Sequence, residues 1–426
     1  MKIAVIGAGI VGVTTAYELA ADGHQVTVFE RRSAVAEETS FANAGVVAPG
    51  YVTPWAAPGM PSKVLSYLFS SHAPVRVRMP LSASEVAWMW RWLRACTLPT
   101  YLVNRARLQR LAFYSRTRLH ALSNDLHLDY ERAEGYMVLL RAEKDHKLVQ
   151  PSLQVLREAG VGFKELSADE ARRIEPGLNP DTGLHAAIHL PNDEVGNCRQ
   201  FALLIKAEAQ RLGAEFKFNT SVTALDKASP ATLWIANETL PHQFDAVVLC
   251  AGLDSTSLLQ GLGIKVPMAA VYGYSISAAV RETLHAPRSA LMDERYKVAI
   301  SRIGQRVRVA GSAEIGGSLA VHRESAIQTL YKVLGDWFPG AAQLASHRRG
   351  HAVGTGVQEW KGARPMLPDG PPVIGASGLP GLWLNLGHGS SGWALSCGSA
   401  RAVTDLIAGR KPDVDLEGLG IDRLLS

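Results

Sequence analysis

"KIAVIGAGIVGVTTAYELAADGHQVTVFER", residues 2–31, predicts a strand, a glycine turn, a helix and a second strand. The apolar run 3–6 is typical of a parallel strand that is buried on both faces. Gly7, Gly9 and Gly12 form the pattern G-x-G-x-x-G. Such glycines allow a tight turn, the close approach of a pyrophosphate, and close packing of the helix on the strand. The order of these features predicts a dinucleotide-binding βαβ unit.

An acidic residue, Glu30, follows the second strand at the spacing where a carboxylate binds both ribose hydroxyls of a dinucleotide. Glu30 also disfavours a dinucleotide with a 2′-phosphate on its ribose, because the carboxylate and the phosphate would repel each other. The unit does not distinguish FAD from NAD. The next stretch, "EETSFANAGVVAPGY" (37–51), is a long loop of small and hydroxyl residues, in which 43–45 can present backbone N–H groups to a flat ligand. Such a loop favours a flavin, with a plain surface loop as the alternative.

Length and composition suit a two-domain protein. The chain has 426 residues, of which 47% are hydrophobic, enough for a sizeable core. Its net charge of +5 fits a membrane surface or an anionic cofactor weakly, and nucleic acid more weakly still. The four cysteines lack metal-site or C-x-x-C spacing, so we expect no metal and a reduced compartment. The sequence has no signal-peptide pattern and no run of about 18 apolar residues, which predicts no membrane-spanning helix.

A second glycine loop, "LGHGSSGW" (386–393), follows a predicted strand and opens a helix that runs to about Ile407. A helix N-terminus carries unpaired N–H donors and a partial positive charge. This terminus would stabilise a reduced flavin, which gathers negative charge at its N1–C2=O edge. The alternative is a plain tight turn with an exposed His388.

An arginine stands among small and apolar residues in "GARPMLPDGPPVIG" (362–375), a stretch that we expect to form buried turns. A guanidinium is almost never fully buried without a partner. We therefore expect Arg364 to pair with an acidic residue such as Asp369, or with a ligand that carries the negative charge. Pro365 biases Arg364 toward an extended backbone, so its side chain leaves from a rigid segment.

Six motifs occur in order between residue 1 and about residue 409. They are "GAGIVGVTTAYELA", "ETSFANAG", "LPNDEVGNCRQF", "GYSI", "ARPMLPDGPPVIG" and "LNLGHGSSGWALSCGSA". Together they resemble the D-amino acid dehydrogenase group of the FAD-dependent D-amino acid oxidase and glycine oxidase family. The resemblance implies an α/β plus α+β fold, with a glutathione-reductase-type Rossmann FAD domain and an inserted antiparallel-sheet substrate domain. We assign residues 1–60, 190–252 and 345–426 to the FAD domain, and 61–189 and 253–344 to the substrate domain.

The resemblance also implies a set of site residues. Arg364 is expected to anchor the substrate carboxylate. FAD is expected to bind non-covalently, because Gly362 aligns with the cysteine that tethers flavin in the related sarcosine oxidases. Candidates for further contact with the substrate, each with a structural role as the alternative, are Tyr272, Tyr274, Tyr296 and His388. The expected FAD contacts are Gly7, Ala8, Gly9, Ile10, Val11, Gly12, Glu30, Arg31, Ser40, Asn43, Ala44, Gly45, Val46, Val222, Ala251, Gly252, Gly387, His388, Gly389, Ser390, Ser391 and Gly392.

The expected reaction is oxidation of a D-amino acid to an imino acid, which is hydrolysed to a 2-oxo acid and ammonia. The flavin accepts a hydride from Cα at N5, so no strong protein base is required and the protein's task is to orient the substrate. An imino-acid dehydrogenase (D-proline or hydroxyproline type) and a glycine or sarcosine oxidase are alternatives within this class. A non-catalytic flavin-binding subunit of a larger assembly is an alternative from another class.

The dehydrogenase resemblance implies that electrons pass to a quinone or another respiratory carrier rather than to oxygen. In "ASEVAWMWRWLRACTL" (83–98), Trp88, Trp90 and Trp92 lie two residues apart beside Arg91. On a helix these rings spread around the axis, which suits a membrane interface as well as a buried helix of the substrate domain. We expect a cytoplasmic protein that can attach peripherally to the inner face of the cell membrane, and no nucleic-acid partner.

Overall fold

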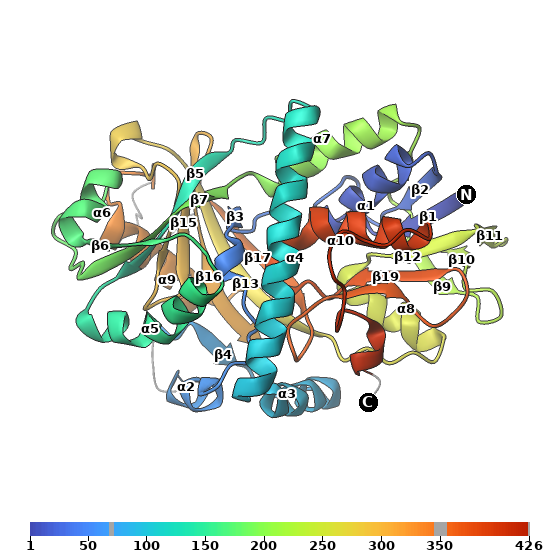
Figure 1. Ribbon diagram of the computed structural model, residues 1–426, viewed down its shortest axis with the longest axis horizontal. Helices are drawn as coiled ribbons and strands as arrows, with labels where there is room; N and C mark the ends of the chain where they lie inside the picture. Colours follow the sequence, from blue (N-terminus) through green and yellow to red (C-terminus); the bar gives the residue numbers. More distant parts are fainter. Residues whose placement is uncertain (68–71, 345–355, 425–426) are drawn as a thin grey trace.

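Two large sheets, one of six strands and one of ten, form the framework of the residues that the structure describes. The structure is a computed structural model, and it describes residues 1–67, 72–344 and 356–424. Figure 1 shows the ten-stranded sheet on the left, the six-stranded sheet on the right, and helix α4 (Leu98–Asp125) standing between them.

The six-stranded sheet carries the N-terminal βαβ unit and has the strand order β18-β19-β12-β1-β2-β8. Its strands pair in parallel except β18, which is antiparallel to β19. The bounds are β1 (Lys2–Ile6), β2 (Gln25–Phe29), β8 (Glu215–Lys217), β12 (Ala246–Leu249), β18 (Val373–Ala376) and β19 (Leu382–Leu386). Ile3 and Val5 are fully buried, because β1 lies inside the sheet and is covered on both faces.

Helices cover one face of this sheet, and a smaller sheet covers the other. The helices that share an apolar core with β1 and β2 are α1 (Ile10–Ala21), α4, α7 (Cys198–Arg211) and α10 (Gly392–Ile407). The opposite face packs on α8 (Ser255–Gly261), β9 (Val222–Leu225) and β10 (Thr232–Ile235), which pairs in turn with β11 (His242–Gln243). The sequence assigned α4 to the substrate domain, yet its Leu108 and Leu119 belong to the core of the six-stranded sheet.

The ten-stranded sheet is mostly antiparallel and has the path β17-β13-β16-β15-β14-β5-β7-β3, with β4 beside β16 and β6 beside β7. Its bounds are β3 (Val46–Val47), β4 (Val75–Val77), β5 (Ala133–Leu140), β6 (Lys164–Ser167), β7 (Ala186–Val195), β13 (Ala269–Ala279), β14 (Ala290–Asp293), β15 (Val298–Ile303), β16 (Arg306–Ile315) and β17 (Gln358–Met366). The helices that pack on it are α2 (Met60–Tyr67), α3 (Ala83–Ala95), α5 (Glu143–Glu158), α6 (Ala168–Ile174) and α9 (Glu324–Trp337).

Strand β17 corrects the expectation that residues 362–375 begin with buried turns. Residues 358–366 form an edge strand that pairs with β13 on one side, and an edge strand tolerates Pro365 because its outer N–H groups need no partner strand. β17 also joins the ten-stranded sheet, although the predicted boundaries put it in the FAD domain. The predicted boundary at 344/345 adjoins residues 345–355, which lie outside the described residues.

Candidate active site

A cavity of about 610 Å³ lies where the two sheets meet. One wall is the loop 39–57 that follows the βαβ unit, and a second is the segment 389–394 at the start of α10. The ten-stranded sheet closes it through β13, β16 and β17. Residues of α2, α4 and α5 also line it, so segments from both ends and the middle of the sequence meet there.

The first glycine turn meets the steric requirements of its motif. Gly7 has φ +99°, and a Cβ there would lie 2.7 Å from the carbonyl oxygen of Cys250. A Cβ at Gly12 would overlap the carbonyl oxygen of Gly7, so this glycine lets α1 approach the turn. Gly9 differs, because the nearest protein atom to its Cβ position is Ser40 Oγ at 3.5 Å. The protein itself leaves room for a side chain at Gly9, and that open space fits the approach of a pyrophosphate.

The carboxylate of Glu30 lies beside this turn. Its Oε2 accepts a hydrogen bond from the N–H of Ala8 at 2.7 Å, and its Oε1 accepts from the N–H of Arg32 at 2.8 Å. Ser40 Oγ accepts from the N–H of Ile10 at 3.0 Å, which caps one free donor of α1. Arg31 forms ion pairs with Glu38 at 2.8 Å and Asp254 at 2.5 Å, so its guanidinium links two loops of the protein.

Two residues from the middle of the chain that the sequence predicts to contact FAD, Ala251 and Gly252, lie at the same end of the six-stranded sheet as the Gly7 turn. Ala251 is 3.0 Å from the Cβ position of Gly7, and Gly252 follows it with φ +55°. Val222 begins β9 and packs against the apolar cluster that contains Phe29.

The loop over 43–46 is held by side chains that the sequence analysis missed. Arg308 Nη1 donates to the carbonyl oxygen of Asn43 at 3.1 Å, and Ser301 Oγ donates to that of Ala44 at 2.7 Å. Trp393 Nε1 donates to the carbonyl oxygen of Gly45 at 3.1 Å. Three successive carbonyls thus accept hydrogen bonds from side chains of β16, β15 and α10, which ties this loop to the ten-stranded sheet and to a helix that packs on the six-stranded sheet. Nothing local in "RVRVA" separates buried Arg308 from exposed Arg306.

The second glycine loop contributes backbone to the cavity and keeps its histidine away from it. Gly389, Ser390, Ser391 and Gly392 line the cavity, and α10 begins at the last of them. His388 is buried, and its Nε2 lies 3.0 Å from Ser399 Oγ. Burial lowers the pKa of His388 to about 3, so the ring is neutral at physiological pH.

Arg364 lies on β17 with its guanidinium flat against Gly273, where a Cβ would overlap it. Its Nη1 donates to the carbonyl oxygen of Ser312 at 3.0 Å, and it lines the cavity. None of the described carboxylates lies within ion-pair distance of Arg364, and Asp369 pairs with Arg423 at 2.8 Å. The expectation that Asp369 could balance Arg364 is therefore wrong. Burial lowers the pKa of Arg364 to about 10, which keeps the side chain charged at neutral pH.

Alternation along β13 separates the nearby tyrosines from Arg364. Side chains on a strand alternate between its faces, so Val271 and Gly273 face the cavity with Arg364, while Tyr272 and Tyr274 belong to the opposite face of β13. Tyr274 reaches the cavity wall, but its hydroxyl donates to Glu314 Oε2 at 2.8 Å. Tyr272 donates to the carbonyl oxygen of a loop glycine at 3.4 Å and does not line the cavity.

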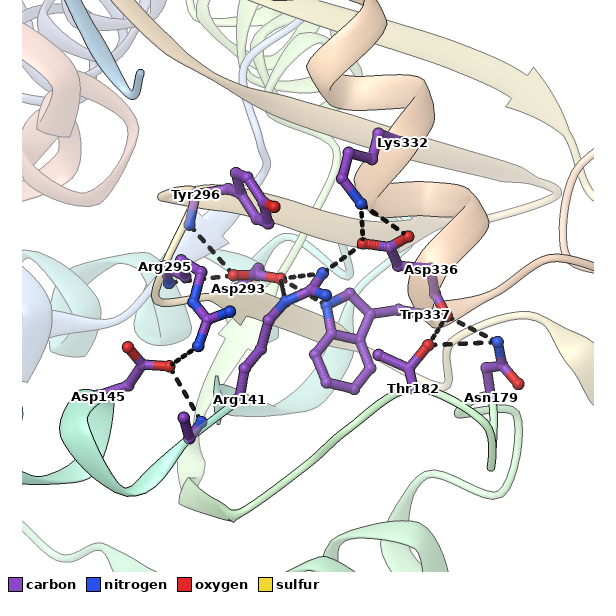
Figure 2. Close-up of polar contacts among 11 residues, drawn as sticks. Arg141, Asp145, Asn179, Thr182, Asp293, Arg295, Tyr296, Lys332, Asp336 and Trp337 are labelled. Atoms are coloured by element: carbon purple, nitrogen blue, oxygen red, sulfur yellow. Dashed lines mark hydrogen bonds and ion pairs between the residues drawn. The ribbon is translucent and has the colours of Figure 1, made fainter. Parts of the chain in front are cut away.

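Tyr296 lies in the turn between β14 and β15 of the ten-stranded sheet. Figure 2 shows it beside Arg141 and Lys332, and its ring stacks on the Arg141 guanidinium at 5.1 Å. Its N–H donates to Asp293 Oδ1 at 3.1 Å. Tyr296 does not line the cavity, so the three tyrosines are not brought together around one ligand.

Residues 2–406 match the family model described as FAD dependent oxidoreductase. The chain belongs to this family. A D-amino acid dehydrogenase of Cereibacter sphaeroides is 41% identical, covering 100% of this chain and 96% of its own length. A glycine oxidase from Geobacillus kaustophilus has a similar structure, with a TM-score of 0.76, 20% identity, and 99% and 98% of the two chains covered. An L-proline dehydrogenase from P. horikoshii has a TM-score of 0.75 and 17% identity over 99% and 97% of the chains. The mixed α/β fold and the FAD dependence that the sequence predicts are thereby confirmed.

Proposed function

We propose that this protein is a dehydrogenase that oxidises D-amino acids to 2-oxo acids and ammonia. The observation that carries this proposal is Arg364, a guanidinium in the wall of the cavity without a carboxylate partner among the described residues. A largely buried cation that faces a cavity favours a bound anion, and the planar fork of arginine matches a carboxylate. The 41% identical relatives named D-amino acid dehydrogenase support the same substrate class.

Residues around the glycine turns fit FAD. We assign the six-stranded sheet to a glutathione-reductase-type Rossmann domain, and the ten-stranded sheet to an inserted substrate domain. The turn 7–12 with Glu30 would hold the pyrophosphate and ribose, while 40–46 and 387–392 would hold the flavin ring. A side chain at Gly362 would overlap the indole of Trp360, which supports non-covalent binding. Bound FAD supplies the acceptor for two electrons.

The protein's own contribution is to orient the substrate. Arg364 can bind both carboxylate oxygens while Gly273 leaves its guanidinium room to lie flat on β13. Val271, Trp360 and Met366 provide apolar surface beside it. The hydroxyls of Tyr272 and Tyr274 are engaged elsewhere, so we assign no proton transfer to these two residues.

Anaerobic addition of D-alanine to the purified holoenzyme tests this function. We expect the oxidised-flavin absorbance to disappear with D-alanine and to persist with L-alanine. An unchanged spectrum with a panel of D-amino acids would favour the non-catalytic flavin subunit. Faster bleaching by D-proline than by any primary D-amino acid would favour the imino-acid alternative, and bleaching by glycine or sarcosine alone would favour the oxidase alternative.

We also propose that the electrons pass to a quinone, and that the protein reaches it by binding a bilayer through α2, α3 and the start of α4. Eight of the seventeen exposed large apolar side chains of the described residues lie within 65–103, on elements that lie together in Figure 1, and we group them as one apolar surface. They are Leu65, Met79, Val86, Trp90, Leu93, Leu98, Leu102 and Val103. Figure 1 shows these elements together along the lower edge of the molecule. Trp88 and Trp92 are buried beneath this surface.

The charge of this segment favours an anionic lipid surface. Residues 60–103 contain one lysine, four arginines and one acidic residue, Glu85. Basic residues around exposed apolar side chains attach a protein to anionic bilayers. Met60 and Lys63 on α2 and Tyr101 on α4 also line the cavity, which brings a bilayer on this surface close to the active site. No helix in the described ranges is long and apolar enough to cross a membrane.

Flotation with lipid vesicles tests the bilayer proposal. We expect binding to vesicles that contain phosphatidylglycerol, weaker binding at high salt, and loss of binding in a Trp90→Glu, Leu93→Glu double variant. Leu240→Glu, at an exposed apolar position between β10 and β11, is the matched control and should bind like the wild type. Failure to bind the anionic vesicles, or a concentration-dependent dimer that buries Trp90 instead, would contradict it.

A further inference from the structure

Arg105 on α4 is a second arginine in the cavity wall, and neither the motifs nor the proposed reaction accounts for it. It is 2% exposed. Among the described residues only Arg308 is a comparably buried arginine, at 4% exposed. Arg308 has short bonds to Ser277 Oγ at 2.9 Å and to the Asn43 carbonyl, so its structural role is evident. Arg105 lacks such bonds.

The donors of Arg105 are poorly used by the protein. Nη1 donates to the hydroxyl of Tyr101 at 3.3 Å and Nη2 to the carbonyl oxygen of Ser152 at 3.4 Å, both at the long end of the hydrogen-bond range. Nε is buried without a partner, and no described carboxylate lies within ion-pair distance. Glu294, an acid that lines the same cavity, forms its ion pair with Lys297.

A buried guanidinium with unused donors is costly unless an anion binds it. Resting on the proposed function, we infer that Arg105 binds a second carboxylate on the side chain of the substrate, so that dicarboxylic D-amino acids such as D-glutamate or D-aspartate are preferred. Arg364 takes the α-carboxylate in this arrangement, and Arg105 takes the distal one from α4. A substrate with a neutral side chain would leave Arg105 without a bound anion. We therefore expect substrates with a second carboxylate to bind more tightly than neutral ones.

Paired substrates that differ only in charge test this inference. With an artificial electron acceptor, we expect the wild type to have at least a tenfold higher kcat/KM for D-glutamate than for D-glutamine, mostly through KM. Arg105→Gln should lower that ratio tenfold or more, and Arg105→Lys should retain part of it because the charge remains. Arg110→Gln on the same helix removes a partly exposed arginine that pairs with Asp415, and should leave the ratio unchanged.

Equilibrium binding provides a measurement that does not depend on turnover. Calorimetry should show that glutarate, with two carboxylates, binds the holoenzyme more tightly than butyrate, and that Arg105→Gln removes the difference. The proposed function itself fails if no D-amino acid reduces the flavin, whereas this inference fails if glutarate and butyrate bind alike.

Three further results would overturn the inference. One is a wild type that does not prefer D-glutamate over D-glutamine. A second is an Arg105→Gln variant that loses kcat/KM equally for D-glutamate and D-glutamine and also has a lower melting temperature. That combination would indicate a structural role for Arg105. The third is an Arg105→Gln variant that no longer reduces quinone but still reduces the dye with the wild-type ratio of kcat/KM for D-glutamate and D-glutamine. That result would mean that Arg105 binds the electron acceptor.

Discussion

Arg141 and Arg364 are both largely removed from solvent, yet Arg141 has two carboxylate partners and Arg364 has none among the described residues. Arg141 donates to Asp293 at 2.6 Å and to Asp336 at 2.8 Å, and the Trp337 indole also donates to Asp293 (Figure 2). The cavity arginine has one carbonyl acceptor and open space beside it.

We expect this difference to separate arginines with a structural role from arginines that bind a ligand. A second paired cluster makes the same point, because buried Glu18 accepts from Arg118 at 2.7 Å and from Arg401 at 3.0 Å behind the six-stranded sheet. Where the chain supplies the anion, we expect arginine to contribute to stability. Where it does not, we expect arginine to contribute to binding.

The largest effect is expected from breaking the cluster of Arg141 with Asp293 and Asp336, and it should appear in the free energy of unfolding. Arg141→Met leaves Asp293 buried without its cation, which should cost about 3–5 kcal/mol of the free energy of unfolding. Chemical denaturation measures this, with Lys332→Met, which removes a partly exposed partner of Asp336, as a control that should cost about 1 kcal/mol or less. The folded fraction of Arg141→Met should keep its kcat/KM. An Arg141→Met protein that is as stable as the wild type but inactive would contradict the contrast between the paired Arg141 and the unpaired Arg364.

Removing the unpaired arginine should act on activity instead. Arg364→Ala should lose about 3 kcal/mol of transition-state stabilisation, roughly a hundredfold in kcat/KM for D-alanine. Arg364→Lys should also be poor, because it retains charge but loses the planar fork. Flavin content and melting temperature should stay near those of the wild type. Near-normal kcat/KM in a flavin-loaded Arg364→Ala protein would rule out the anchor role.

Gly273→Ala sharpens the comparison without touching a charge. Its Cβ would overlap the guanidinium of Arg364, whose flexible side chain must move away. Displacement of a positioning group by about 1 Å costs up to about a hundredfold in rate, so we expect a loss between about tenfold and that limit in kcat/KM. Gly183→Ala, where a Cβ meets no atom within 4 Å, is the matched control. Equal kinetics for the two variants would show that the position of Arg364 does not limit the reaction.

The smallest effect is expected from a buried group that carries no charge. Burial lowers the pKa of His388 to about 3, below its unfolded value, so the unfolded state binds more protons as pH falls. The free energy of unfolding should therefore decrease by about 2 kcal/mol from this group between about pH 8 and pH 5. His388→Gln should remove that part of the pH dependence in denaturation curves. An unchanged pH dependence would mean that His388 titrates normally.

Local sequence was sufficient for the features that depend on neighbouring residues. The turn at Gly7, Gly9 and Gly12, the carboxylate of Glu30 beside it, and the loop that opens α10 are all requirements of backbone conformation over a few residues. Such requirements are encoded where they act, so the dinucleotide-type βαβ unit could be predicted from them. The choice of FAD over NAD came instead from the resemblance carried by the whole set of motifs.

Tertiary structure alone decided how the charges and hydroxyls are used. That Asp369 pairs with Arg423, that Tyr274 donates to Glu314, and that Arg105 enters the cavity from α4 depends on contacts between residues at least forty positions apart. A side chain's partner is set by which strand faces and helices meet, and single-sequence periodicity does not specify those meetings. The sequence by itself determined the two glycine turns and the carboxylate beside the first of them, whereas the folded chain decided which arginines have no carboxylate partner among the described residues.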